Sequence, residues 1–127
     1  MRIDPNEPSI ILRVEVFGEK ESRIVDMALD TGATYVMIPW HIAESLGYDP
    51  AVSRRRLNLA TASSTVVAPL ITVKAIKTLG QQAMNVDVVC LDLPSGSRVE
   101  GLLCLSFLRN FKLVLDYKQL NLEIIDP

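Results

Sequence analysis

The feature that most constrains this chain is the apolar run of residues 27–29, which ends at Asp30-Thr31-Gly32. Consecutive apolar residues indicate a strand that enters the core, and a glycine after it is typical of a tight loop. Such a strand would deliver Asp30 to one end of the fold on a rigid element, with the Thr31 hydroxyl beside it. Reactive side chains often occupy loops held in this way. The tripeptide is also found in plain turns, so on its own it does not decide between the two.

Length and composition indicate a single globular domain. A chain of 127 residues, 49% of them hydrophobic, buries roughly two-thirds of its unfolded surface. The formal net charge is −2, and Arg54-Arg55-Arg56 is the one basic cluster, so no nucleic-acid-binding surface is expected. Histidine, cysteine and acidic residues do not gather at the spacing of a metal site. We therefore expect neither a metal nor a cofactor.

The cysteines and the chain start bear on the cellular location. Cys90 and Cys104 lie in apolar runs, where a free thiol behaves as a small buried hydrophobe, and this favours a reducing compartment. No cationic, apolar leader opens the sequence, and no apolar stretch is long enough to cross a bilayer. We expect a cytoplasmic protein without a membrane segment, although a chain trimmed of a leader or an anchor would have the same sequence.

Hydrophobic patterning predicts a mainly β protein. Residues 1–9 are polar, contain Pro5 and Pro8, and are interpreted as an N-terminal arm before a domain of residues 10–127. Apolar residues alternate with polar ones from residue 10 to residue 16, which predicts a strand. Short helices are expected after Pro39 and near Ser106. The other stretches that we interpret as strands are residues 23–29, 57–61, 65–73, 73–79, 86–91, 112–117 and 120–125.

Serine and histidine do not form a nucleophile motif here. His41 is the one histidine, and no serine or cysteine motif accompanies it, so a structural or exposed role is favoured. Ser63 and Ser64 lack the glycine pattern of a nucleophile elbow. We interpret them as the tip of a hairpin.

Four features follow one another along the chain. They are Asp30-Thr31-Gly32-Ala33 after an apolar strand, a helix ending at Leu46-Gly47, a hairpin at residues 60–64, and Gly101-Leu102-Leu103 leading into Ser106-Phe107-Leu108. In this order, the features resemble the retropepsin-like aspartic proteases, and above all their non-viral, single-lobe members, including bacterial ones. The resemblance extends over residues 10–125, and it implies a small closed, β-barrel-like acid protease lobe with one or two short helices.

The resemblance also implies roles for individual residues. Asp30 matches the catalytic aspartate. The residues that match the active-site loop are Thr31, Gly32 and Ala33. Those that match the flap, which closes over a bound peptide, are Thr61, Ala62, Ser63 and Ser64. Those that match the loop beneath the site are Leu102, Leu103 and Cys104.

Two positions depart from the family pattern. Cys104 stands where the family usually has glycine, so we expect either a loop relaxed around the thiol or a weakened site. Ser63-Ser64 stands where the flap tip often has glycine, which predicts slower or differently shaped closure.

The side chains proposed for the cleft wall are Val36, Ile38 and Leu70.

The implied mechanism needs two carboxylates that share a proton. The chain has one Asp-Thr-Gly; Asp26 lies on the same strand, and Asp116 lacks a following glycine loop. We therefore expect a homodimer in which each chain gives one Asp30, acting as an endopeptidase on a peptide or protein substrate. The alternative is a catalytically weak or inactive dimer that serves as a peptide- or protein-binding module. A β domain with a coincidental tripeptide is a third possibility.

Overall fold

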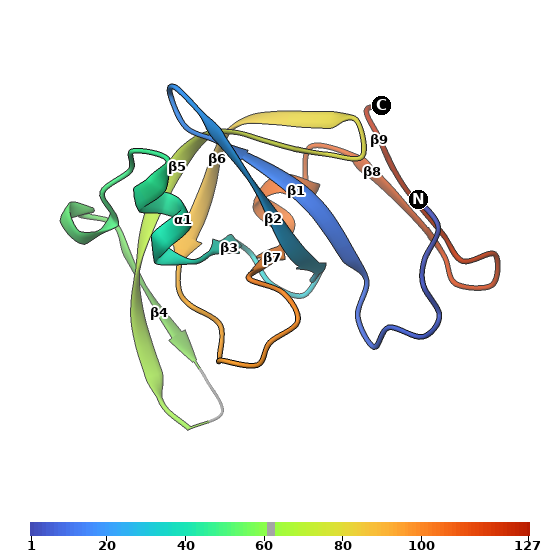
Figure 1. Ribbon diagram of the computed structural model, residues 1–127, viewed down its shortest axis with the longest axis horizontal. Coiled ribbons are helices and arrows are strands. Elements are labelled where there is room, and N and C mark those ends of the chain that lie inside the picture. The colour runs from blue at the N-terminus through green and yellow to red at the C-terminus, as the bar shows by residue number, and fades with distance from the viewer. Residues whose placement is uncertain (61–62) are drawn as a thin grey trace.

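The computed structural model describes residues 1–60 and 63–127 of the chain, and it is mainly β, as expected (Figure 1). The helices are α1 (Trp40–Ser45), α2 (Leu105–Leu108) and the 3-10 helix η1 (Pro50–Val52). The strands are β1 (Ile11–Phe17), β2 (Ser22–Leu29), β3 (Val36–Ile38), β4 (Arg56–Ala60), β5 (Thr65–Thr78), β6 (Gln81–Cys90), β7 (Gly101–Leu103), β8 (Lys112–Asp116) and β9 (Asn121–Ile125).

The main sheet closes on itself. Its strands are hydrogen-bonded in the order β1-β2-β7-β3-β6-β5-β4, and β5 also pairs with β1, which closes a ring of six strands. β4 lies outside the ring and, among the described residues, pairs with β5 alone. Within residues 1–60 and 63–127, closure leaves the six strands without a free edge. The expected closed, β-barrel-like lobe is thus confirmed.

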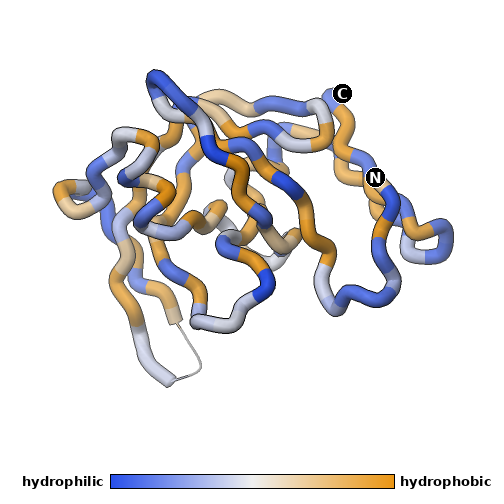
Figure 2. Tube along the Cα trace, in the orientation of Figure 1, coloured by the Kyte–Doolittle hydropathy of each residue, from blue (hydrophilic) through white to orange (hydrophobic). Residues whose placement is uncertain are grey.

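The interior of the barrel is filled by alternate residues of its strands. Leu12, Val14 and Val16 of β1 are almost completely buried, whereas Arg13 between them is exposed. In Figure 2 hydrophilic residues mark the N-terminal loop and the turn between β1 and β2, while hydrophobic residues recur along the strands. The core therefore follows the period of two that the sequence displays.

The expectation of two separate strands at residues 65–73 and 73–79 is wrong. β5 is one strand of 14 residues that passes through Val73 without a turn. Its beginning pairs with β4, most of its remainder pairs with β6, and its last part also pairs with β1. The turn into β6 consists of Leu79 and Gly80, both with positive φ (48° and 79°), which is the two-residue turn typical of hairpins.

The first residues of the chain lie along β9. The Ile3 amide donates to the Leu120 carbonyl oxygen at 2.8 Å, and the Leu122 amide donates to the Met1 carbonyl oxygen at 2.8 Å. Ile3 is buried in the core. Residues 1–3 therefore extend the small β8-β9 sheet, whereas the division of the chain at residue 10 stays a prediction.

Candidate active site

Asp30 lies directly after β2, at an end of the barrel. β2 and β7 are parallel, with Leu29 opposite Leu103, and the Asp30 amide donates to the Leu103 carbonyl oxygen at 2.9 Å. The carboxylate Oδ1 accepts a hydrogen bond of 3.0 Å from the Gly32 amide. The side chain is half-buried. The strand and the bond to Leu103 thus fix the Asp30 backbone, while the Gly32 amide orients its carboxylate.

The other limb of the active-site loop is held by the start of α2. The Leu105 amide donates to the Ala33 carbonyl oxygen at 3.1 Å, and the Ser106 amide donates to the Thr34 carbonyl oxygen at 2.7 Å. The structure therefore brings together residues 30–33 and residues 102–104, the two segments that the sequence analysis assigned to the site.

The glycines near the site serve different purposes. Gly32 does not have a positive φ, and an added Cβ would lie 3.4 Å from Asp30 Oδ1, an ordinary contact. We expected the loop after β2 to need the backbone conformations that glycine alone adopts freely. This expectation is wrong for Gly32, because its φ is not positive and a side chain would fit there. At Gly101 an added Cβ would lie 2.5 Å from the Met37 carbonyl oxygen, so the close approach of β7 to β3 requires a glycine there.

Cys104 fits its position without backbone strain. Its φ of −126° and ψ of −173° are extended values that any residue adopts. The residue is completely buried, and burial, followed by the negative charge of Asp30, raises the pKa of its thiol to about 12. Of the two expectations for this departure, the relaxed loop agrees with the structure.

The buried thiols predict a loss of stability at alkaline pH. The pKa of Cys90 is also raised to about 12, because of burial and then the charges of Asp92 and Glu44. Above pH 9 the unfolded thiols ionise while the folded ones keep their protons, so the free energy of unfolding should fall as the pH rises from about 9 towards 12. Urea titrations across this range should show a smaller fall for Cys104→Ala than for the wild type. Parallel falls in the two proteins would contradict this expectation.

Of the residues assigned to the flap, the structure describes Ser63 and Ser64, which precede β5 in the pair of strands β4 and β5 that extends away from the barrel (Figure 1). Ser63 and Ser64 are exposed. Thr61 and Ala62 lie outside the described residues. The role of this hairpin as a flap stays a prediction.

A cavity of about 310 Å³ lies beside the active-site loop, between β3 and β4. Val36 and Ile38 are fully buried in the barrel core, so their assignment to the cleft wall is wrong. Leu70 does not line the cavity but packs in the apolar cluster beneath it. Residues 35–38 are all apolar, which hides the alternation of β3 from the sequence. The residues that line the cavity are Ala33, Thr34, Tyr35, Met37, Leu57, Asn58, Leu59 and Val89.

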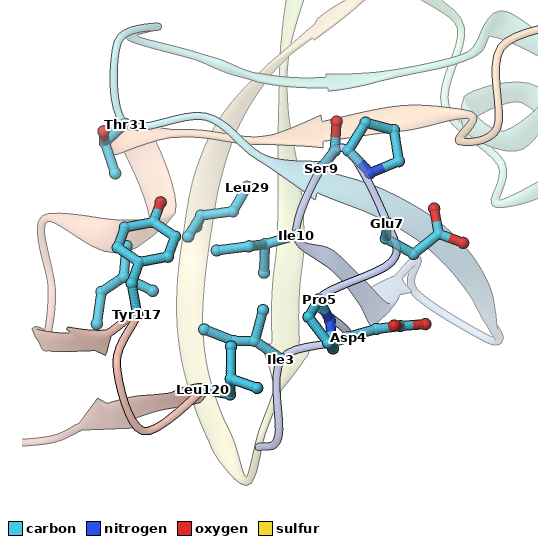
Figure 3. A pocket seen from close by; sticks show the side chains of 12 residues that line it. Ile3, Asp4, Pro5, Glu7, Ser9, Ile10, Leu29, Thr31, Tyr117 and Leu120 are labelled. Carbon is cyan, nitrogen blue, oxygen red and sulfur yellow. The ribbon is translucent and has the colours of Figure 1, made fainter.

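A second hollow, of about 490 Å³, adjoins Thr31 (Figure 3). Leu29 and Ile10 form part of its apolar lining, and the N-terminal loop and the turn between β8 and β9 border it. Thr31 is exposed, and Tyr117 beside it is 67% exposed. The active-site loop is thus continuous with an open surface of mixed polar and apolar character.

The other acidic residues considered as partners for the reactive carboxylate are placed elsewhere. Asp26 is exposed and lies between the buried Val25 and Met27, so it points out of the barrel. Asp116 accepts a hydrogen bond of 2.9 Å from the Gln119 amide in the β8-β9 turn. His41 is exposed, as expected.

Within residues 1–60 and 63–127, no three histidine, cysteine or acidic side chains are grouped so that they could hold a metal ion. Over the same residues, no helix combines the length and the apolar character needed to span a membrane.

Comparison with known proteins gives the family. The model of a family described as aspartyl protease matches residues 12–107. The chain belongs to the aspartyl protease family. No curated protein matches the sequence of this family member significantly.

Solved structures extend the comparison to the fold of this aspartyl protease family member. A retropepsin-like aspartic protease from Rickettsia conorii has a TM-score of 0.72 and 20% identity, over 98% of this chain and 88% of that chain. The retroviral protease-like domain of Ddi1 from Leishmania major has a TM-score of 0.56 and 16% identity, over 90% and 87%. The fold is therefore retropepsin-like.

Sequence reasoning missed one group beside the site, the hydroxyl of Ser106. Its Oγ accepts a hydrogen bond of 2.9 Å from the Val36 amide, across 70 positions of sequence. A serine at the start of a helix is commonplace, so no local signal distinguished this one. Its contact depends on the tertiary structure.

Proposed function

We propose that the protein is an aspartic endopeptidase that works as a homodimer, with Asp30 of each chain forming a shared dyad. The observation that carries this proposal is the Asp30 carboxylate at the end of β2, in a loop held on both limbs, in a member of the aspartyl protease family. The chain supplies one such carboxylate, and the chemistry requires two. A second copy is the simplest source of the other.

The proposed reaction divides the work between the two carboxyl groups. One, ionised, takes a proton from water as the water attacks the peptide carbonyl, and the other, protonated, polarises that carbonyl. Two like charges about 3 Å apart cannot both ionise cheaply, which keeps the pair in this mixed state. The Gly32 amide, which donates to Asp30 Oδ1, would hold each carboxylate in a fixed orientation relative to its loop.

A twofold axis between the two Asp30 residues defines the surface that the second copy would cover. Thr31 follows Asp30 directly, so the hollow that it adjoins would lie next to this axis. The apolar residues and Tyr117 around that hollow would then be protected from water by the second copy. On the other side of the loop, the cavity beside β3 and β4 would receive an apolar side chain of an extended peptide.

The alternative is a dimer that binds a peptide or protein without efficient cleavage. A site weakened by Cys104 would favour such a dimer, but the backbone of Cys104 is extended and unstrained. The serines at the hairpin tip still favour it, because they are stiffer than glycine. Turnover decides between the two functions.

The first experiment combines light scattering with turnover of a mixed peptide library over a range of protein concentrations. If the dimer is weak, activity should rise faster than linearly with protein concentration, because only the dimer has both carboxylates. A strict monomer would contradict the shared dyad. A dimer that cleaves nothing would favour the binding module.

A further inference from the structure

Among the described residues, one short segment supplies the backbone hydrogen bonds that tie the loop carrying Asp30 to the rest of the barrel. Leu103 holds the Asp30 amide, and the amides of Leu105 and Ser106 hold the carbonyl oxygens of Ala33 and Thr34. These bonds all come from residues 103–106, the end of β7 and the start of α2. They join backbone to backbone, so they do not depend on which side chains stand there.

Ser106 adds a link that does depend on its side chain. Its amide donates to Thr34, and its Oγ accepts from the Val36 amide at 2.9 Å. The two bonds enclose Tyr35, at the point where the loop enters β3. Ser106 thus sets the direction in which the chain leaves the active-site loop.

Loss of the hydroxyl would affect the loop rather than the core. Val36 is completely buried, and its amide would lose the acceptor that Ser106 provides. A buried amide without a partner is unfavourable, so the chain would shift or admit water at this place. Three residues separate Val36 from Gly32, so a shift of the chain at Val36 would be transmitted along the loop to Gly32. The Gly32 amide orients Asp30 Oδ1.

We propose that Ser106 is a positioning residue, whose hydroxyl holds the active-site loop so that Asp30 keeps its reactive orientation. The kinetic part of this inference rests on the proposed function. Ser106 acts through Val36 and the loop, and it takes no part in the chemistry itself.

The kinetic test compares Ser106→Ala with Ser106→Thr. We expect Ser106→Ala to lower kcat by about 10- to 100-fold with little change in KM, because small misplacements of a catalytic group have effects of this size. Ser106→Thr keeps an oxygen at the same place and should retain most of kcat. Ser45→Ala is the matched control, since the Ser45 hydroxyl donates to Ile42 within the α1 region and should not matter for turnover. An unchanged kcat in Ser106→Ala would overturn the proposal.

A second test does not depend on cleavage. The Gly32 amide proton should report the orientation of the Asp30 carboxylate, because the two groups are hydrogen-bonded and the bond displaces the NMR signal of the amide proton downfield. We expect this displacement, measured at one pH, to shrink in Ser106→Ala and to persist in Ser106→Thr. An unchanged Gly32 signal in Ser106→Ala would mean that the hydroxyl supports only β3, and would overturn the proposal.

The experiments also give a clear result if the wild type is inactive or if Ser106→Ala does not fold. If the wild type cleaves nothing, the proposed function fails, while the Gly32 signal still decides the role of Ser106. If Ser106→Ala does not fold, Ser106→Thr and Ser106→Val form a second pair of nearly equal shape that differs in the hydroxyl. Equal displacement of the Gly32 signal in that pair would overturn the proposal, and a smaller displacement in Ser106→Val would support it.

Discussion

We expect Asp30→Asn to abolish peptide cleavage while the protein keeps its fold and its dimer. An amide cannot accept the proton from water, and two asparagines cannot share a proton as a carboxyl pair does. Loss of a general base typically lowers the rate by about 10²- to 10⁴-fold, and here both halves of the dyad change together. Asparagine has nearly the same shape, and its side-chain oxygen can still accept from the Gly32 amide. Turnover and light scattering on the same samples measure both properties.

Asp26→Asn is the matched control for this experiment. It makes the same chemical change on the strand that leads to Asp30, at an exposed residue that points out of the barrel. Its turnover should equal that of the wild type. Retained cleavage in Asp30→Asn would reject the dyad, and retained partner binding without any wild-type turnover would favour the binding module.

Phe107→Ala should have the largest effect on stability. Phe107 is completely buried in α2, and its ring centroid lies 4.9 Å from that of Phe111. Removing a buried phenylalanine side chain leaves a cavity and costs about 3–5 kcal/mol of unfolding free energy. Urea denaturation at fixed protein concentration should show a lower midpoint with an unchanged slope.

The graded control for Phe107 is Phe107→Leu, which leaves a smaller cavity and should fall between the wild type and Phe107→Ala. Equal stability of all three proteins would mean that the ring does not pack as the structure has it. Because Phe107 follows Ser106 in the helix that supports the active-site loop, its loss should also lower turnover at temperatures where the protein stays folded.

Local patterns in the sequence were enough to predict much of the fold. The alternation from residue 10 to residue 16 marks β1, and the apolar run that stops at Asp30 marks the end of β2. Proline before α1 and glycine soon after it bound the helix. These signals act between near neighbours, so the sequence displays them directly.

The sequence by itself determined the mainly β architecture and the place of the one carboxylate on which the proposed chemistry depends. The tertiary structure alone decided that β5 is continuous, that Met37 rather than Val36 or Ile38 lines the cavity, and that Ser106 accepts from Val36. A uniformly apolar strand hides which face is inside, and barrel closure brings together residues 70 positions apart. Such contacts depend on strand pairing and register, which local propensity does not specify.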